Sequence, residues 1–156
     1  SRNRYGIIGP MYPQEMTPEA ITEKIAKNPL TSDKIGKRPA YSVVTNCTYD
    51  GVCYHARKVQ DLLDESLDRI HFDEAWYGYA RFNPIYRDHF AMRDDPRKDD
   101  EPTVFATHST HKLLNALSQA SFIHIRNGRN AIDFNRFNQA YHMHDYFAAI
   151  CNLCLK

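Results

Sequence analysis

The sequence has no excess of charge of either sign. Its 156 residues include 20 Lys and Arg against 19 Asp and Glu, which leaves a net charge of +1. This balance excludes the strongly basic surface that is typical of nucleic-acid binding, and it excludes an acidic tail. Long apolar runs are also missing, because the longest uncharged stretch, residues 113–125, contains polar residues and is shorter than the about 20 apolar residues of a membrane span. We therefore expect neither nucleic acid nor a membrane among its partners.

Cysteine is scarce as well, and the chain contains only four: Cys47, Cys53, Cys151 and Cys154. A secreted domain held by disulfides usually has more cysteine at this length, and no secretory signal pattern precedes the first predicted helix. We therefore expect a cytoplasmic protein whose cysteines are reduced and free of metal. The alternative is a small zinc module in which Cys151-x-x-Cys154 joins His142 and His144, although H-x-H is an unusual spacing for structural zinc.

The sequence does contain a regular alternation of strand and helix patterns. Short runs rich in β-branched and aromatic residues predict four strands, at residues 41–45, 69–72, 103–107 and 121–125. Apolar residues at helical spacing predict an amphipathic helix over residues 56–66. Thr17 followed by Pro18 predicts the start of another helix, which ends near Lys27. Strands that alternate with helical crossovers form parallel sheets, so the predicted fold class is α/β.

Two of the predicted strands end in residues that carry chemistry. Asp73 follows the second strand, and the third strand is followed by Ser109, Thr110, His111 and Lys112. In open α/β sheets, ligands bind just beyond the carboxyl ends of the strands. A lysine held there has an amine suited to Schiff-base chemistry, and the hydroxyl and imidazole groups beside it suit a phosphate. On spacing alone, a solvated surface lysine and a helix-capping aspartate are the alternatives.

Longer motifs extend this interpretation. Three segments occur in order along the chain: TNCTYDG at 45–51, HFDEAW at 71–76 and THSTHKLL at 107–114. Together they closely resemble the bacterial ornithine/lysine/arginine decarboxylases of the inducible acid-stress type, which depend on pyridoxal 5'-phosphate (PLP). The run DEAWYGYARF at 73–82 is most similar to the arginine-specific branch. The later motifs SQAS at 118–121 and FNQAY at 137–141, with His144, fit the same family.

The resemblance implies a role for each matching residue. Lys112 would carry the cofactor through a Schiff base, and Asp73 would pair with the pyridine nitrogen of the cofactor. Ser109 and His111 would hold its phosphate. Trp76 would line the cofactor pocket. No resident metal is implied.

The implied fold is the second half of a type I aminotransferase-like, mostly parallel sheet with flanking helices, in which residues 121–125 form the antiparallel member. The implied reaction removes the α-carboxylate of a basic amino acid, arginine in particular, and releases carbon dioxide and a polyamine-type amine. It consumes a proton and thereby serves acid resistance. Lysine and ornithine are alternative substrates, and Glu74 is either an acidic contact for a basic substrate or a supporting or surface group. The enzymes resembled are cytoplasmic homodimers that assemble into larger homo-oligomers.

Two departures from the family pattern shape the expected domain organisation. The family's chains are several times longer, so residues 1–144 are expected to form a part of the PLP-binding major domain. After His144 the sequence departs from the family, and residues 145–156 are expected to be a divergent or truncated tail. The expected function is the cofactor-lysine portion of a PLP-dependent decarboxylase, with the isolated 156 residues inactive. The alternative is a non-catalytic remnant, or an assembly piece, of such an enzyme.

Overall fold

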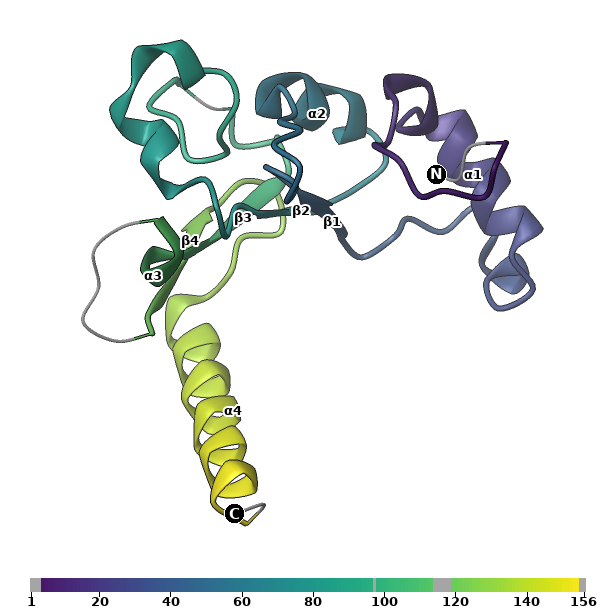
Figure 1. The fold of residues 1–156 in the computed structure, drawn as a ribbon. Coiled ribbons are helices and arrows are strands. Elements are labelled where there is room, and N and C mark those ends of the chain that lie inside the picture. Colours follow the sequence, from purple (N-terminus) through teal and green to yellow (C-terminus); the bar gives the residue numbers. More distant parts are fainter. Residues whose placement is uncertain (1–3, 97, 114–118, 155–156) are drawn as a thin grey trace.

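The structure, a computed structural model, describes residues 4–96, 98–113 and 119–154. A four-stranded sheet lies between an N-terminal helical segment and a long C-terminal helix that extends away from it (Figure 1). The strands are β1 Ser42–Thr45, β2 Arg69–Asp73, β3 Thr103–Ser109 and β4 Ser121–Arg126. The α-helices are α1 Pro18–Lys27, α2 Ala56–Leu63, α3 Thr110–Leu113 and α4 Phe134–Cys154. Short 3-10 helices span Pro13–Glu15, Ser32–Lys34, Gly78–Phe82 and Pro84–Tyr86. No helix in these described ranges combines the length and the apolar composition that crossing a membrane requires.

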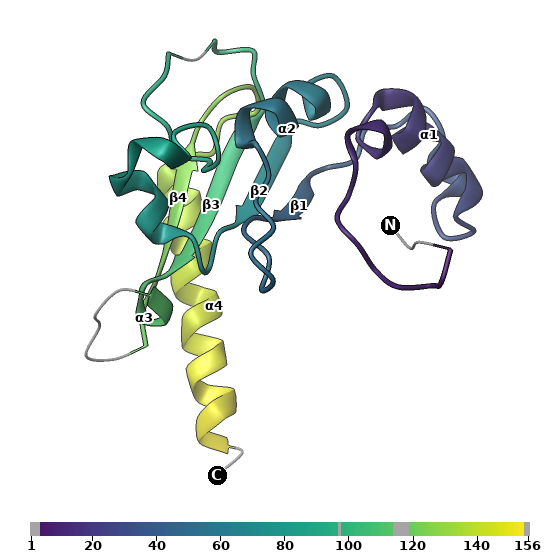
Figure 2. The same ribbon diagram turned by 45° about the horizontal axis from the view of Figure 1, so that its top comes forward.

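The strands lie side by side in the order β1-β2-β3-β4 (Figure 2). β1, β2 and β3 run parallel, and β4 runs antiparallel to β3. This arrangement confirms the predicted α/β fold with a mostly parallel sheet. β2 is one residue longer than predicted, so Asp73 is its last residue and pairs with Thr45 on β1 and Thr107 on β3. The carboxyl ends of the three parallel strands therefore lie at one edge of the sheet.

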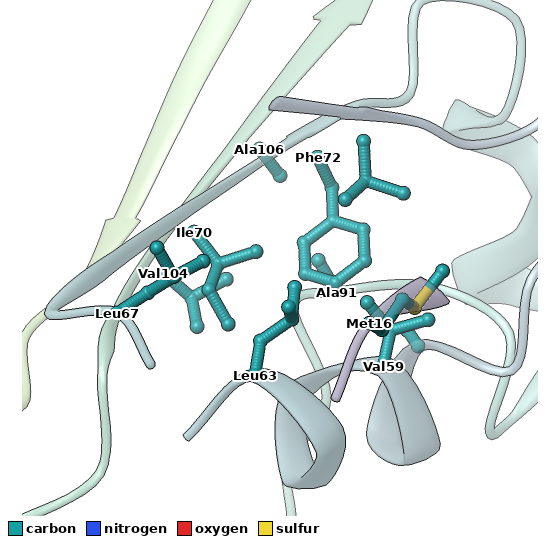
Figure 3. Packing of buried hydrophobic residues seen from close by; sticks show 11 residues of the cluster. Met16, Val59, Leu63, Leu67, Ile70, Phe72, Ala91, Val104 and Ala106 are labelled. Carbon is teal, nitrogen blue, oxygen red and sulfur yellow. The ribbon is translucent and has the colours of Figure 1, made fainter. Parts of the chain in front are cut away.

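α2 covers one face of the sheet and forms the core with it. Ile70 and Phe72 of β2 are completely buried on this face and lie near Val59 and Leu63 of α2 in the same apolar cluster (Figure 3). Burial of a side chain of this size stabilises the fold by about 1.5–3 kcal/mol. This packing holds β2 and β3 in place, and with them the strand ends that carry the candidate residues.

The opposite face of the sheet is less buried. Val43, His71, Phe105 and Ile125 form one row across the four strands, each in register with the next. Val43 is 52% exposed, and the other three are half-buried. Parallel sheets usually carry helices on both faces. This face therefore differs from the corresponding face of a complete α/β domain.

Helix boundaries agree with the sequence prediction for α1 and differ from it for α2. α1 begins at Pro18 with the side chain of Thr17 as its N-terminal cap, as predicted. The prediction for α2 was residues 56–66, but the helix ends at Leu63. The Leu63 carbonyl accepts hydrogen bonds from the N–H groups of Ser66 and Leu67, at 3.1 and 3.0 Å. These bonds close the helix with a turn that leads into β2.

The segment predicted as a divergent or truncated tail continues a helix. α4 runs without a break from Phe134 to Cys154, and residues 155–156 lie outside the described residues. The side chains of Cys151 and Cys154 also lie outside the described part. Their reduced and metal-free state therefore stays a prediction.

The packing around Cys47 has a testable consequence. This side chain is buried in a second cluster with Tyr77 and Phe90. Burial, and next the neighbouring thiol of Cys53, raises the pKa of the Cys47 thiol from 9.0 to about 11. The reactive thiolate is then about a hundredfold rarer than in an ordinary cysteine. We expect iodoacetamide to label Cys47 at mildly alkaline pH far more slowly than it labels N-acetylcysteine, as measured by peptide mass spectrometry, and equal rates would contradict the raised pKa.

Candidate active site

The residues that follow β2 are hydrogen-bonded to the carboxyl end of β3. The N–H of Glu74 donates to the Thr107 carbonyl at 3.0 Å, and the N–H of Ser109 donates to the Ala75 carbonyl at 3.3 Å. α3 begins directly after β3 and contains Lys112. The structure thus brings the candidate residues of both strands to the same edge of the sheet.

Asp73 is half-buried at the end of β2. Its Oδ1 accepts a hydrogen bond from the Ala75 N–H at 3.2 Å, which fixes the carboxylate against its own backbone. Because side chains alternate along a strand, Asp73 lies on the face opposite to that of buried Phe72. A carboxylate held in this way can accept a charge-assisted hydrogen bond from a cationic donor beyond the edge.

Lys112 and Trp76 are in contact at this edge. The exposed amine of Lys112 lies with Nζ 4.9 Å from the centroid of the Trp76 ring. The same ring meets Tyr49 edge-on, with 5.7 Å between the ring centroids. An ammonium group beside an indole at an exposed site is stabilised by about 0.5–1 kcal/mol. Trp76 therefore orients the lysine amine while leaving it open to solvent.

The polar residues before Lys112 fall into two groups. Thr110 Oγ1 donates to the Ala120 carbonyl at 3.1 Å, and Nδ1 of His111 lies 2.9 Å from the same oxygen. These two side chains tie α3 to the start of β4. Ser109 is half-buried and lines a cleft of about 340 Å³ together with Trp76. Of the two predicted phosphate ligands, Ser109 thus faces a cleft, and His111 is in contact with the backbone.

Comparison with known proteins identifies the family. The family model described as "Orn/Lys/Arg decarboxylase, major domain" matches residues 1–154. The chain belongs to this family. Among curated proteins, the biodegradative arginine decarboxylase of Escherichia coli is 68% identical over 154 residues, and lysine decarboxylase LdcA of Pseudomonas aeruginosa is 47% identical over 146 residues. Among solved structures, lysine decarboxylase A from Pseudomonas aeruginosa has a TM-score of 0.78 at 46% identity.

The chain spans about a fifth of the Orn/Lys/Arg decarboxylases that it matches. The match to the arginine decarboxylase covers 99% of this chain and 20% of that protein, and the match to LdcA covers 92% and 19%. The solved structure is matched over 89% of this chain and 18% of its own chain. The resemblance that the motifs indicated is confirmed, and the chain is a section of the major domain of this family.

In this section of the decarboxylase domain, Glu74 joins the ends of the three parallel strands. Its side chain is completely buried. Oε1 accepts hydrogen bonds from the side-chain amide of Asn46, beyond β1, at 2.9 Å and from the Ala91 N–H at 2.8 Å. Oε2 lies 2.9 Å from Nε2 of His108 on β3. The carboxylate is therefore a supporting group, which is one of the two interpretations that the sequence allowed.

The sequence motifs contained Asn46 and His108, but no role was predicted for either residue. A usable signal was the alternation of side chains along each strand. Glu74 comes two residues after buried Phe72, and His108 comes two residues after buried Ala106. That spacing places both polar side chains on the core face, where buried polar groups need partners.

His108 also contacts His124 of β4, with 4.9 Å between the ring centroids. Burial, and next the neighbouring His108, lowers the pKa of His124, while Glu74 opposes this shift. The ring of His124 is therefore uncharged at neutral pH. Both histidines line the 340 Å³ cleft with Trp76 and Phe122. The cleft is thus lined by aromatic rings and by the neutral imidazole of His124, at the sheet edge that carries Lys112.

Proposed function

We propose that this chain is the cofactor-lysine portion of a PLP-dependent decarboxylase that acts on a basic amino acid, arginine in particular. The observation that carries the proposal is the shared strand edge: Asp73 ends β2, and Lys112 lies in α3, the helix that directly follows the neighbouring parallel strand β3. Membership of the Orn/Lys/Arg decarboxylase family supports the reaction class. The 68% identity to an arginine decarboxylase supports arginine as the substrate.

The residues at this edge fit PLP in chemical type, because they offer an amine for its aldehyde, a carboxylate for its ring nitrogen and a hydroxyl for its phosphate. In the proposal, Lys112 would hold PLP covalently through its aldehyde carbon, with loss of water, and Asp73 would keep the proton on the ring nitrogen. Ser109 and His111 hold the phosphate, and Trp76 lines the pocket. When bound, PLP supplies an electron sink for the electron pair that the α-carbon keeps after carbon dioxide leaves.

Lys112 and Asp73 hold or move protons in this mechanism. Lys112, in its ammonium form, would give a proton to the substrate carbon or would assist product release. Its exposed position beside Trp76 leaves the amine room to do so. Asp73 keeps a negative charge beside the ring nitrogen and so favours the protonated ring, which takes up electrons more readily.

Glu74 is not available to bind the guanidinium of arginine. Its carboxylate is completely buried, and both of its oxygens already contact protein groups. In the proposal, groups elsewhere in the whole protein, including a partner subunit of a homodimer or larger homo-oligomer, recognise the far end of the substrate. We further propose that the whole enzyme acts in the cytoplasm, where the proton that it consumes supports acid resistance.

A second candidate function, a non-catalytic assembly piece of such an enzyme, is favoured by the less buried face of the sheet. Val43 is 52% exposed there and Ile123 is 37% exposed. An exposed apolar surface of this kind is typical of an interface. A full-length protein that folds and assembles without taking up PLP would support this alternative.

The test of the proposed function uses the full-length protein loaded with PLP. We expect carbon dioxide release from arginine, with kcat/KM at least about tenfold above the values for lysine and ornithine, because arginine differs from both in its distal group. The isolated 156 residues are expected to release none. Preference for lysine would overturn the substrate assignment, and PLP uptake without carbon dioxide release from any of the three would overturn the reaction.

A further inference from the structure

His71 lies on β2 two residues before Asp73, and the mechanism proposed above does not use it. Residues two apart on a strand point to the same face, so this imidazole lies behind the carboxylate on the face opposite α2. Nε2 of His71 lies 3.1 Å from Oγ1 of Thr107 on β3. Thr107 is also the register partner of Asp73. An imidazole, a hydroxyl and a carboxylate are thus neighbours at the end of the sheet.

The surroundings of His71 keep its ring uncharged. Burial lowers the pKa of His71, and the carboxylate of Asp73 opposes this shift. From the neighbouring strands, its register partners are Val43 and Phe105, and the Phe105 ring meets the imidazole edge-on at 6.4 Å between centroids. On β2 itself, the charged residues of the same face are Asp73 and Arg69. At neutral pH the imidazole is therefore a neutral neighbour of the carboxylate.

We infer that His71 is a positioning residue for Asp73: together with the Thr107 hydroxyl it supports the carboxylate from behind, and in its uncharged form it leaves the full negative charge of Asp73 for a cationic ring N–H. This inference rests on the proposed function, because the ring nitrogen of the cofactor is the group that Asp73 serves. A cation at position 71 would share that charge and weaken the hold on the ring proton. The coupling between the two side chains belongs to the chain itself and is measurable without the cofactor.

The first experiment measures the protonation midpoint of His71 in the full-length protein without PLP. Hydrogen–deuterium exchange at the ring carbon of individual histidines, read by mass spectrometry over a series of pH values, gives this midpoint. Asp73→Asn removes the attraction that raises the pKa of His71, so the midpoint falls, by on the order of one unit. The exchange profile of His55, at the start of α2, is the internal control. A His71 midpoint that Asp73→Asn leaves unchanged overturns the inference.

The second experiment measures the pH midpoint at which the ring nitrogen of PLP loses its proton in the loaded full-length protein, read from the nitrogen-15 NMR shift of ring-labelled PLP. His71→Leu removes the polar support, so the ring proton is lost at lower pH, with a shift of about 0.5 unit or more. His71→Gln and Thr107→Ser keep a polar partner and stay near the parent midpoint, whereas Thr107→Val shifts as His71→Leu does. Equal midpoints in His71→Leu and His71→Gln overturn the inference. A protein that takes up no PLP counts against the proposed function instead, while the exchange experiment still decides the coupling of His71 to Asp73.

Discussion

Replacement of Lys112 by alanine in the full-length protein is expected to abolish amine formation from arginine. The variant loses the primary amine that binds the cofactor covalently and the group that returns the proton. Loss of a positioned proton-transfer group alone slows a reaction by about 10²–10⁴-fold, and loss of the covalent attachment adds to this. Carbon dioxide release and the visible absorbance of the PLP-loaded protein measure the two effects separately. We expect both signals to disappear together.

Two control variants test whether the reactive amine of Lys112, and not simply a positive charge or any lysine, is required. Lys112→Arg keeps a cation that can lie beside the ring of Trp76, but a guanidinium does not lose its proton near neutral pH, so this variant is expected to be as inactive as Lys112→Ala. Lys58→Ala removes an exposed lysine from α2 and is expected to leave turnover unchanged. Full activity in Lys112→Ala would remove the assignment of this edge as the active site.

The strands were predictable because each strand is a short β-rich run whose pattern is local. The start of α1 was predictable for the same reason, since Thr17 and Pro18 act within one helical turn. The end of α2 was not, because the polar residues 64–66 that follow Leu63 fit either a helix or a turn, and the hydrogen bonds to the Leu63 carbonyl end the helix there. Competition between local hydrogen bonds decides such an end, and hydrophobic spacing does not report it.

The candidate site shows the same division. The strand-end rule and the motifs pointed to Asp73 and Lys112, and the register brings their strands together as neighbours. The contact between Lys112 and Trp76 depends on how α3 leaves β3, which sequence spacing does not define. The hydrogen bond between Asn46 and Glu74 was likewise not predictable from the sequence, because the two residues meet only through the pairing of β1 with β2. Residues that act through sheet register are found from the fold, and residues that act through a local motif are found from the sequence.

The second large effect is expected for Glu74→Ala, and it is a loss of stability. The buried carboxylate of Glu74 accepts hydrogen bonds from Asn46 at 2.9 Å and from the Ala91 N–H at 2.8 Å, and it lies 2.9 Å from His108. Removing one member of a buried charged network costs about 3–5 kcal/mol, because the polar groups that remain lose their partners in a site that water reaches poorly. These groups come from separate segments at the strand edge. Loss of the carboxylate therefore weakens the contacts that hold the ends of the parallel strands together.

Amide hydrogen exchange of the full-length protein, read by mass spectrometry, measures this effect where it arises. A loss of about 3 kcal/mol speeds exchange through local opening by about a hundredfold, and the peptide that contains Ala91 should show it. Glu74→Gln is the matched control: its carbonyl oxygen still accepts from Asn46 and Ala91, and its amide nitrogen can still form a hydrogen bond with the ring of His108, so most of the protection should remain. Exchange as slow in Glu74→Ala as in Glu74→Gln would mean that the hydrogen bonds of Glu74 add little to stability. The strand ends would then be held by the apolar packing of Phe72 and its neighbours alone.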